Sequence, residues 1–572
     1  MKNKWIRILM STILVSSLLY GCTSNETAVA QGTLSEAEKE NQEDAKASGS
    51  EITAEGDELF TERDYETDYE EAESIRIVLS DSGIEAGDGV AVENMTVTIM
   101  DEGTYIVSGN LSDGQLIVDA AESAKIHLVF DNTEISSADS APVYIKQADK
   151  VFLTLADGTT NILASSSTFA QTEEEGDNID AVIFSKADLT LNGNGSLQIT
   201  TDSGNGITSK DDLVFTGGSY IVNAGNHGLE GKDSVRIAAG AYTITADSDG
   251  IHSDNNEDEG KGFVYLLDGE LTINAADDGI HAENNVTIDG GTVTVADGYE
   301  GIEGRTININ GGTINVAVSD DGLNAAGGND SSGMQGGDFP DVQMQGDTSE
   351  FYIRITGGTI TITAGGDGID SNGSLYVSGG ETYISGPTNS ANGALDYNGT
   401  GEITGGIFIA AGASGMAMNF SDSSTQGSIL VMASEAQTGA VVLMDEGGTE
   451  LLRFTPAREY ESVLISVPEI TSDGSFQVAM GEETQEITMN GLLYGTGSGI
   501  GGRGNGRNGA GGTGEEMMTP PDDMELPDGA GAMAPPDGDG SMQAPDGQLG
   551  GRGGSPEKGA PGGQDEQTGS TE

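Results

Sequence analysis

The sequence is poor in several residue types that stabilise small folds or recognise charged partners. Its 572 residues include one cysteine, one tryptophan and 13 prolines, and only 5% are aromatic. The single cysteine, Cys22, excludes intrachain disulfides. The single tryptophan, Trp5, lies in an amino-terminal segment that reads as a removable signal, so a mature sugar binder would have no tryptophan platform. Basic residues number 23 against 94 acidic ones, which argues against nucleic acid and anionic lipid surfaces as direct partners.

Glycine, by contrast, is abundant, with 88 residues, and many of them belong to a repeat between Asn205 and Ser414. Each unit has a turn that reads Asp-Gly-Ile or close to it, an alternating apolar run, often a Gly-Gly pair, and a second alternating run. The turn glycines recur every 21 or 22 residues, with wider gaps where segments are inserted. In the unit that begins at Asp278, apolar residues take every second position within 286–288 and within 293–295, which is strand periodicity.

Units of this size cannot bury their apolar side alone, so they must stack on one another as a solenoid. Three short strands per unit fit a parallel β-helix. The leucine-asparagine signature of a leucine-rich repeat is absent, and a β-propeller needs roughly twice the period. The sequence therefore predicts an all-β fold whose body is a parallel β-helix solenoid.

Stacking aligns equivalent residues into columns. The residues between and after the inward columns are expected to face water. A large aliphatic column is expected to point inward and contains Ile183, Ile207, Leu229, Ile251, Ile280, Ile302, Leu323 and Ile369. Two positions later, a column of small residues is expected to point inward where the chain curves and contains Ser185, Ser209, Gly231, Ser253, Ala282, Gly304, Ala325 and Ser371.

Changes in composition divide the rest of the chain. Residues 23–74 are acidic with little apolar periodicity and are predicted to form a disordered tether. The solenoid is expected over 75–415, with a capped start and an extruded insertion at about 327–349. Residues 416–495 alternate without glycine turns and are expected to form a C-terminal β cap. The tail 496–572 is rich in Gly, Pro, Asp and Met and is predicted to be disordered.

The amino-terminal segment 1–22 has the pattern of a targeting signal. Three basic residues precede the apolar run 8–20, which is short for a membrane span. The run ends in Leu19-Tyr20-Gly21-Cys22, which resembles a bacterial lipobox, although tyrosine replaces the usual small residue. We expect a lipoprotein that is held at the extracytoplasmic bacterial surface only by a lipid on Cys22. An ordinary secretory signal or an uncleaved anchor is the alternative.

A column two residues before the aliphatic one is rich in carboxylates. Adjacent rungs lie about 4.8 Å apart, and like charges at that distance repel by about 3 kcal/mol at an effective dielectric of 20. Calcium would neutralise this column because it accepts many oxygen ligands in flexible geometry. The alternative is that solvated Asp and Asn simply suit glycine turns. The predicted calcium ligands, from this column and the one after the small residues, are Asp249, Asp254, Asp278, Glu283, Glu300, Asp321 and Asp367.

Histidines and basic residues lie in neighbouring columns. His252 and His281 occupy equivalent outward positions on adjacent rungs. We expect them to contact a ligand or to lie on the strand surface, and zinc is a second possibility although no closely spaced histidine pair is present. Lys210, Lys232 and Arg305 share the column after the small residues. They could meet the carboxylates of an acidic sugar, or they could pair with nearby glutamates.

Several runs carry a resemblance to a known family. Asn205-Gly-Ile-Thr-Ser-Lys-Asp-Asp-Leu213, His227-Gly-Leu-Glu-Gly-Lys-Asp-Ser-Val235 and Asp249-Gly-Ile-His-Ser-Asp254 resemble the secreted bacterial carbohydrate-binding proteins that are built on a right-handed parallel β-helix. Asn178-Ile-Asp-Ala-Val-Ile-Phe-Ser-Lys-Ala-Asp-Leu189 and Ser108-Gly-Asn-Leu-Ser-Asp-Gly-Gln115 are similar to the same family. The resemblance covers about residues 75–495. It implies binding of plant-type polysaccharides, including cellulose and pectic acid sugars, bound calcium, and structural similarity to pectate-lyase β-helices.

The expected function is therefore that of a monomeric surface lipoprotein that binds polysaccharide, either polygalacturonate-like or cellulose, with calcium bridging protein and sugar carboxylates. A binding protein is expected rather than an enzyme. One alternative is a calcium-dependent polysaccharide lyase, with Arg305 or Lys232 as the base. Another is a structural or adhesive surface protein whose calcium serves only folding.

Overall fold

The described part of the chain lies within one compact unit, Met1–Gly504. The predicted signal peptide with Cys22, most of the predicted tether, the insertion 327–349 and the tail lie outside the described residues. The one helical element that lies wholly within the described residues is a short 3-10 helix, η3 (Glu62–Tyr65), and no helix among these residues is long and apolar enough to span a membrane. The computed structural model describes residues 59–166, 169, 178–258, 260–326 and 350–495.

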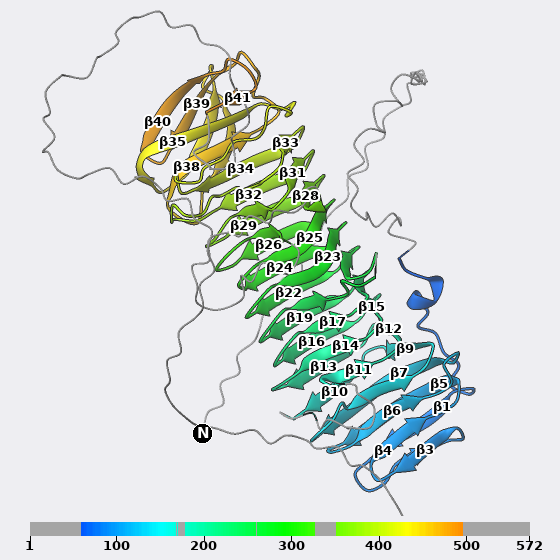
Figure 1. Cartoon of the computed structure of the whole chain (residues 1–572). Coiled ribbons are helices and arrows are strands. Elements are labelled where there is room, and N and C mark those ends of the chain that lie inside the picture. Colours follow the sequence, from blue (N-terminus) through cyan, green and yellow to red (C-terminus); the bar gives the residue numbers. More distant parts are fainter. Residues whose placement is uncertain (1–58, 167–168, 170–177, 259, 327–349, 496–572) are drawn as a thin grey trace, which may run out of the picture. The chain divides into compact units, whose positions relative to one another are not determined.

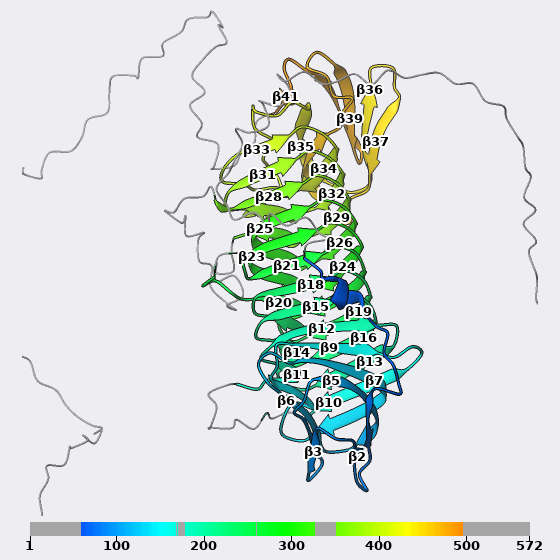
Figure 2. The same cartoon turned by 90° about the vertical axis from the view of Figure 1, so that its right-hand side faces the viewer.

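The strands form the stacked rungs of a parallel β-helix (Figures 1 and 2). Each rung supplies one strand to each of three faces, and each strand pairs in parallel with its counterpart on the next rung, as β13 does with β16 and β16 with β19. The structure thus confirms the predicted all-β parallel β-helix.

The strands of the solenoid lie on three faces. The first face contains β8 (Val143–Gln147), β11 (Ala181–Ser185), β14 (Asn205–Ser209), β17 (Leu229–Gly231), β20 (Ile251–Ser253), the start of β23 (Ile280–Ile288), the start of β25 (Ile302–Ile309), β27 (Leu323–Ala325) and β30 (Ile369–Ser371). The second face contains β9 (Lys150–Leu155), β12 (Asp188–Gly193), β15 (Asp212–Phe215), β18 (Ser234–Ile237), β21 (Phe263–Leu266), the ends of β23 and β25, β28 (Tyr352–Ile355), β31 (Ser374–Val377) and β33 (Gly401–Ile403). The third face contains β10 (Thr160–Ser165), β13 (Ser196–Thr201), β16 (Ser219–Ala224), β19 (Ala241–Ala246), β22 (Glu270–Ala275), β24 (Thr292–Asp297), β26 (Thr313–Ala317), β29 (Thr359–Thr363), β32 (Glu381–Ser385) and β34 (Ile407–Gly412).

The parallel rungs begin earlier than the glycine repeat. Parallel pairing already joins β4 to β6 and β5 to β7, where no Asp-Gly-Ile turn is present. Before them, β1 pairs antiparallel with β2, and β3 pairs antiparallel with β4. The elements of this section are β1 (Ile75–Leu79), β2 (Glu85–Ala86), β3 (Val90–Glu93), β4 (Thr96–Ile99), β5 (Gly103–Leu111), β6 (Gln115–Asp119) and β7 (Lys125–Ser137).

The other end of the solenoid is covered by antiparallel strands. The last strand of the third face, β34, pairs antiparallel with β38, which pairs antiparallel with β35. A separate antiparallel sheet has the order β37, β36, β39, β40, and its Val441 and Val478 share an apolar cluster with Ile409 of β34 and Val463 of β38. The last parallel rung therefore does not present a bare edge. These elements are β35 (Ser428–Gln437), β36 (Val441–Asp445), β37 (Glu450–Phe454), β38 (Tyr460–Ser466), β39 (Ser475–Met480), β40 (Glu483–Thr488) and β41 (Leu493–Tyr494).

The core consists of the two predicted inward columns and their counterparts on the other faces. All eight residues of the aliphatic column are 0% exposed. They pair from rung to rung, for example Ile183 with Ile207 and Leu323 with Ile369. The eight small residues two positions later are buried as well. The periodicity of the sequence thus locates the core correctly on this face.

The turn glycines before the aliphatic column are required by lack of space. A Cβ on Gly279 would lie 2.6 Å from the carbonyl oxygen of Gly301, on the next rung, and 2.5 Å from a methyl group of Val295. A Cβ on Gly301 would likewise meet the carbonyl oxygen of Gly322 and the side chain of Val316. No positive φ is involved at these turns. The repeated glycine is therefore needed because the next rung leaves no room for a side chain here.

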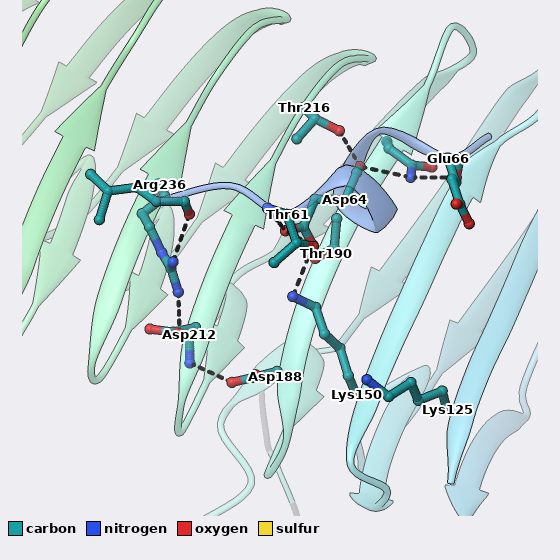
Figure 3. A network of polar contacts seen from close by, with 12 residues as sticks. Thr61, Asp64, Glu66, Lys125, Lys150, Asp188, Thr190, Asp212, Thr216 and Arg236 are labelled. Atoms are coloured by element: carbon teal, nitrogen blue, oxygen red, sulfur yellow. Dashed lines mark hydrogen bonds and ion pairs between the residues drawn. The ribbon is translucent and has the colours of Figure 1, made fainter. Parts of the chain in front are cut away.

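Residues 59–66, here called the strap, run across the second face (Figure 3). We expected residues 23–74 to be a disordered tether, but the end of that segment is fixed to the solenoid. Leu59 and Phe60 pack in an apolar cluster with Phe263 and its neighbours. Asp64 is only 2% exposed. Sequence periodicity missed the strap because eight residues are too few to show a pattern, and its partners lie far away in the chain.

Asp64 is the main polar attachment of the strap. Its Oδ1 lies 2.8 Å from Lys150 Nζ and accepts a hydrogen bond of 2.6 Å from Thr190 Oγ1. Its backbone carbonyl accepts hydrogen bonds from Asn192 and Thr216. Burial alone would raise the pKa of Asp64, but the hydrogen bonds from Lys150 and Thr190 outweigh it and lower that pKa. The carboxylate is therefore ionised and paired at neutral pH.

Replacing Asp64 with alanine is expected to release the strap, because Lys150 and Thr190 would lose their partner. Breaking one side of a buried ion pair costs about 3–5 kcal/mol, enough to open a short local segment while the rungs stay folded. Hydrogen exchange of residues 59–66 would measure the opening. Glu62→Ala, on the exposed neighbour, is the control. Equal exchange in the two variants would show that Asp64 does not hold the strap.

Candidate functional site

Two neighbouring ladders of outward-facing polar side chains run along the first face. One ladder lies between the two inward columns, and in its register Glu230 pairs with His252, His252 with His281 and His281 with Glu303. The other lies at the turns that precede the strands. We call the two together the polar stripe, and its members are Asn205, Thr208, His227, Glu230, Asp249, His252, Asp278, His281, Glu300, Glu303, Asp321, Asn324, Asp367 and Asp370.

The stripe is far more buried than the sequence suggested. We expected these outward positions to face water, but Asp249 is 3% exposed, Asp278 5% and Glu300 1%. The physical reason is that side chains on adjacent rungs stack directly on one another, and the two ladders cover each other laterally. Burial strengthens every charge interaction within the stripe relative to a solvated surface. The stripe is therefore a line of desolvated carboxylates and imidazoles, which the sequence alone did not reveal.

One end of the stripe, here called the histidine end, contains three imidazoles around one carboxylate. The Nδ1 atoms of His227, His252 and His281 lie 3.1, 2.5 and 3.8 Å from Asp249 Oδ2. The rings of His227 and His252 are stacked, with centroids 4.2 Å apart. Burial alone would raise the pKa of Asp249, but hydrogen bonds and charge from the histidines lower it strongly. Burial alone would lower the pKa of His227, but its bond to Asp249 raises that pKa.

The adjacent part of the stripe, here called the carboxylate end, brings three acids together. Asp278, Glu300 and Glu303 offer oxygens that all lie within 4.8 Å of one another, and all three side chains are buried. His281 Nδ1 lies 3.4 Å from Glu303 Oε2, and Asn324 Nδ2 donates to Glu300 Oε2 over 2.8 Å. Calcium–oxygen bonds are about 2.3–2.6 Å long, so oxygens at this separation can share one ion. The donor set fits a hard cation with oxygen ligands.

The acidity continues beyond the carboxylate end. Burial raises the pKa of Asp321 well above its usual range, and Asp367, Asp370 and Glu300 raise it further. Burial, Asp278 and Asp249 also raise the pKa of Asp277 to about 6. In both places carboxylates are crowded by other negative charge. A bound cation would remove this repulsion.

The structure brings together some of the predicted metal ligands and separates others. Asp249, Asp278 and Glu300 take part in the converging groups just described. Asp254 is exposed and Glu283 is buried. Neither belongs to a converging group among the described residues. Asp321 and Asp367 lie further along the stripe, where Asp321 Oδ1 accepts a hydrogen bond from the Asp367 backbone. Their metal role stays a prediction.

Glu303 is a candidate ligand that sequence reasoning considered only as a partner for basic residues. Its position between two inward residues, Ile302 and Gly304, places it beside His281 on the preceding rung, and the observed register pairs the two. That register was the available signal.

The basic residues of the third predicted column behave as local partners. Lys210 Nζ lies 3.0 Å from Glu230 Oε1, so the alternative of pairing with a glutamate holds for this lysine. Arg305 lies 3.6 Å from Glu350, which is exposed. Lys232 is half-buried beside the stripe. Lys210 thus holds the end of the stripe, and ligand contact by Lys232 or Arg305 stays a prediction.

A separate open cavity of about 500 Å³ lies at the border of the first and second faces. Asp188, Asp211 and Asp233 line it together with Arg236 and Lys261. Burial raises the pKa of Asp211 to about 7, and its hydrogen bond to Asp233 contributes. Lys261 Nζ lies 2.7 Å from Asp233 Oδ2, which leaves Asp211 as the protonated member of the pair.

The cavity predicts a pH dependence of stability. Because the folded pKa of Asp211 is raised, the folded state holds a proton that the unfolded state has released, between about pH 4 and pH 7. The contribution of Asp211 to the free energy of unfolding is therefore fully present below about pH 4 and is lost as the pH rises through about 7. Three pKa units correspond to about 4 kcal/mol, but Asp211 is partly exposed and solvent screens its interactions, so Asp211→Asn is expected to stabilise the chain by about 1–2 kcal/mol at pH 8 and by less at pH 5. Urea unfolding at both values tests this, with the exposed Asp139→Asn as control; an equal gain at both pH values would contradict it.

Comparisons with known proteins agree with the resemblance of the sequence motifs. Residues 93–348 match the family model described as carbohydrate-binding domain-containing protein, and this range includes the stripe from Asn205 to Asn324. A relative of the same description from Acetivibrio thermocellus is 38% identical over 137 residues, which cover 24% of this chain and 48% of the relative. The match thus spans about half of that relative. Among solved structures, a polysaccharide lyase-like protein from C. thermocellum, a gadolinium derivative, is 35% identical; the match covers 44% of this chain and 98% of the other, with a TM-score of 0.39.

Proposed function

We propose that this chain, whose residues 93–348 match the model of the carbohydrate-binding domain-containing protein family, binds a uronic-acid-rich polysaccharide along its polar stripe with the help of calcium. The family match supports a polysaccharide partner. The acidic nature of the sugar and the identity of the ion are part of the proposal.

The observation that carries the proposal is the convergence of Asp278, Glu300 and Glu303 on buried positions of adjacent rungs. A surface with this much negative charge repels a polyuronate unless a cation lies between them. Calcium suits this role because it coordinates protein and sugar oxygens in one flexible shell. The three side chains would hold the ion, and the ion would supply the positive charge that sugar carboxylates need.

The solenoid explains why an extended polymer is the preferred ligand. Equivalent positions repeat on every rung of the first face, so one chain of sugars can meet several rungs at once. Weak contacts then add through effective concentration, without any single deep pocket. Lys232 and Arg305, next to the stripe, are proposed to meet sugar carboxylates directly. We further propose that the protein acts as a monomer, anchored at the bacterial surface through Cys22.

Calorimetric titration of polygalacturonate into the full chain, with calcium and again after chelation, tests the proposal. Binding that requires calcium is expected. Binding that ignores calcium would contradict the bridging role, and binding of cellulose alone would contradict the acidic ligand. The same mixtures are monitored for the absorbance of unsaturated uronide. Its appearance would favour the lyase alternative, in which a basic side chain removes a proton next to a calcium-bound carboxylate.

A further inference from the structure

The histidine end of the stripe has a donor set that differs from the rest. One ring nitrogen from each of His227 and His252 and one carboxylate oxygen of Asp249 all lie within 4.8 Å of one another, and the Nδ1 atoms of both rings face Asp249 Oδ2. Imidazole nitrogen is a ligand for zinc and other first-row transition metals, whereas calcium selects oxygen. Two histidines and one carboxylate with a fourth position open is a common way to hold such an ion.

The spacing of the three atoms is close to what a tetrahedral ion needs. Bonds of about 2.0 Å to nitrogen and oxygen place neighbouring ligand atoms about 3.3 Å apart. His227 Nδ1 lies 3.1 Å from Asp249 Oδ2, and His252 Nδ1 lies 2.5 Å from the same oxygen. The His252 ring would have to move back by about 1 Å. The two rings are stacked at 26°, and what brings their Nδ1 atoms to one place is their shared contact with Asp249 Oδ2.

The surrounding residues fix these ligands. Asp249 Oδ1, the oxygen that faces away from His252, accepts a hydrogen bond of 3.1 Å from the backbone of Asp278. The backbone nitrogen of His227 donates to Asn205 Oδ1 over 3.1 Å. Such outer contacts orient metal ligands and raise affinity. The carboxylate is almost completely buried, while the side chains of His227 and His252 keep 18% and 16% exposure, so solvent reaches the open position.

We propose that His227, Asp249 and His252 form a site for one zinc-class divalent ion, separate from the calcium of the carboxylate end. A water molecule or a ligand oxygen completes the coordination. His281, whose Nδ1 lies 3.8 Å from Asp249 Oδ2, stands next to this site on the following rung. The site does not depend on the proposed polysaccharide function, because the argument uses only donor type and geometry.

Cobalt(II) is the probe that tests the site, since its visible spectrum reports coordination number and nitrogen ligation, and zinc is added as competitor. The full chain is expected to bind one equivalent of cobalt, with the intense visible bands of a tetrahedral or five-coordinate ion, and zinc should displace it. His252→Gln and His227→Gln should each weaken cobalt binding by at least about 100-fold.

The fourth histidine of the chain provides a matched control. His127 lies on β7, faces outward from another face and contacts Thr154 over 2.8 Å. His127→Gln should leave the cobalt spectrum unchanged. Calcium binding, measured in the same variants, is expected to persist and shows that they are folded. Absence of the visible bands, equal cobalt binding in all variants, or displacement of cobalt by an equivalent of calcium would each overturn the proposal.

Discussion

A chain that carries both Glu300→Gln and Glu303→Gln is expected to lose calcium-dependent binding of polygalacturonate by at least about 100-fold, because calcium affinity follows the number of charged ligands. Two of the three converging carboxylates at the carboxylate end would become neutral amides of the same size. Glutamine keeps the packing and one oxygen, so the change is chiefly one of charge. Calorimetry with calcium, and with calcium plus polygalacturonate, measures both effects.

Glu270→Gln is the matched control for this variant. Glu270 lies on β22 of the third face and is exposed, so its loss removes one charge of the same kind away from the stripe. It is expected to change calcium and polysaccharide binding by less than about twofold, since isolated surface charges contribute little. Equal losses in the control and the double variant would attribute binding to net charge and not to the carboxylate end.

Replacing Gly301 with alanine is expected to destabilise the solenoid by at least about 3 kcal/mol, which is the upper part of the usual range for overpacking. The new methyl group would meet the Gly322 carbonyl oxygen on the next rung and the side chain of Val316. That oxygen accepts a hydrogen bond of 3.2 Å from the backbone of Ile302, so moving the rungs apart breaks a ladder bond. Urea unfolding, followed by circular dichroism, measures the loss.

The comparison for this variant lies on the same rung. Gly304 belongs to the small inward column, where the neighbouring rungs carry Ala282 and Ala325. A Cβ there would lie 3.4 Å from its nearest neighbours, which is ordinary contact. Gly304→Ala should change the free energy of unfolding by no more than about 0.5 kcal/mol. If both alanines were equally tolerated, the close approach of rungs at the turn glycines would not limit the sequence.

The fold could be predicted from the sequence because every rung repeats the same pattern of a turn glycine and alternating apolar residues. Alternation identifies the strands, and the positions of Ile207, Leu229 and Ile251 in the repeat identify the inward side of one face. The structure confirms these residues as fully buried. The early rungs of β5 and β7 were less evident because their turns lack the Asp-Gly-Ile pattern. Repetition, more than any single motif, made the prediction reliable.

The candidate site was predictable only in part. The outward ladder with Asp249 and Asp278 follows from the register, but its burial does not. Periodicity shows which side of the strand a residue faces, but not how far neighbouring side chains cover it. The pairing of Lys210 with Glu230 depends on side-chain reach across a rung. The attachment of Asp64 to Lys150 joins residues far apart in the chain, where no periodic signal connects them.

A crystal structure of the protein with calcium and an oligogalacturonide would test the central claim most directly. The account predicts a calcium ion held by Asp278, Glu300 and Glu303, with a sugar carboxylate oxygen in its coordination shell and the oligosaccharide running across the rungs of the first face. An oligosaccharide bound to another face, or bound at the stripe with no calcium between it and these side chains, would contradict the account.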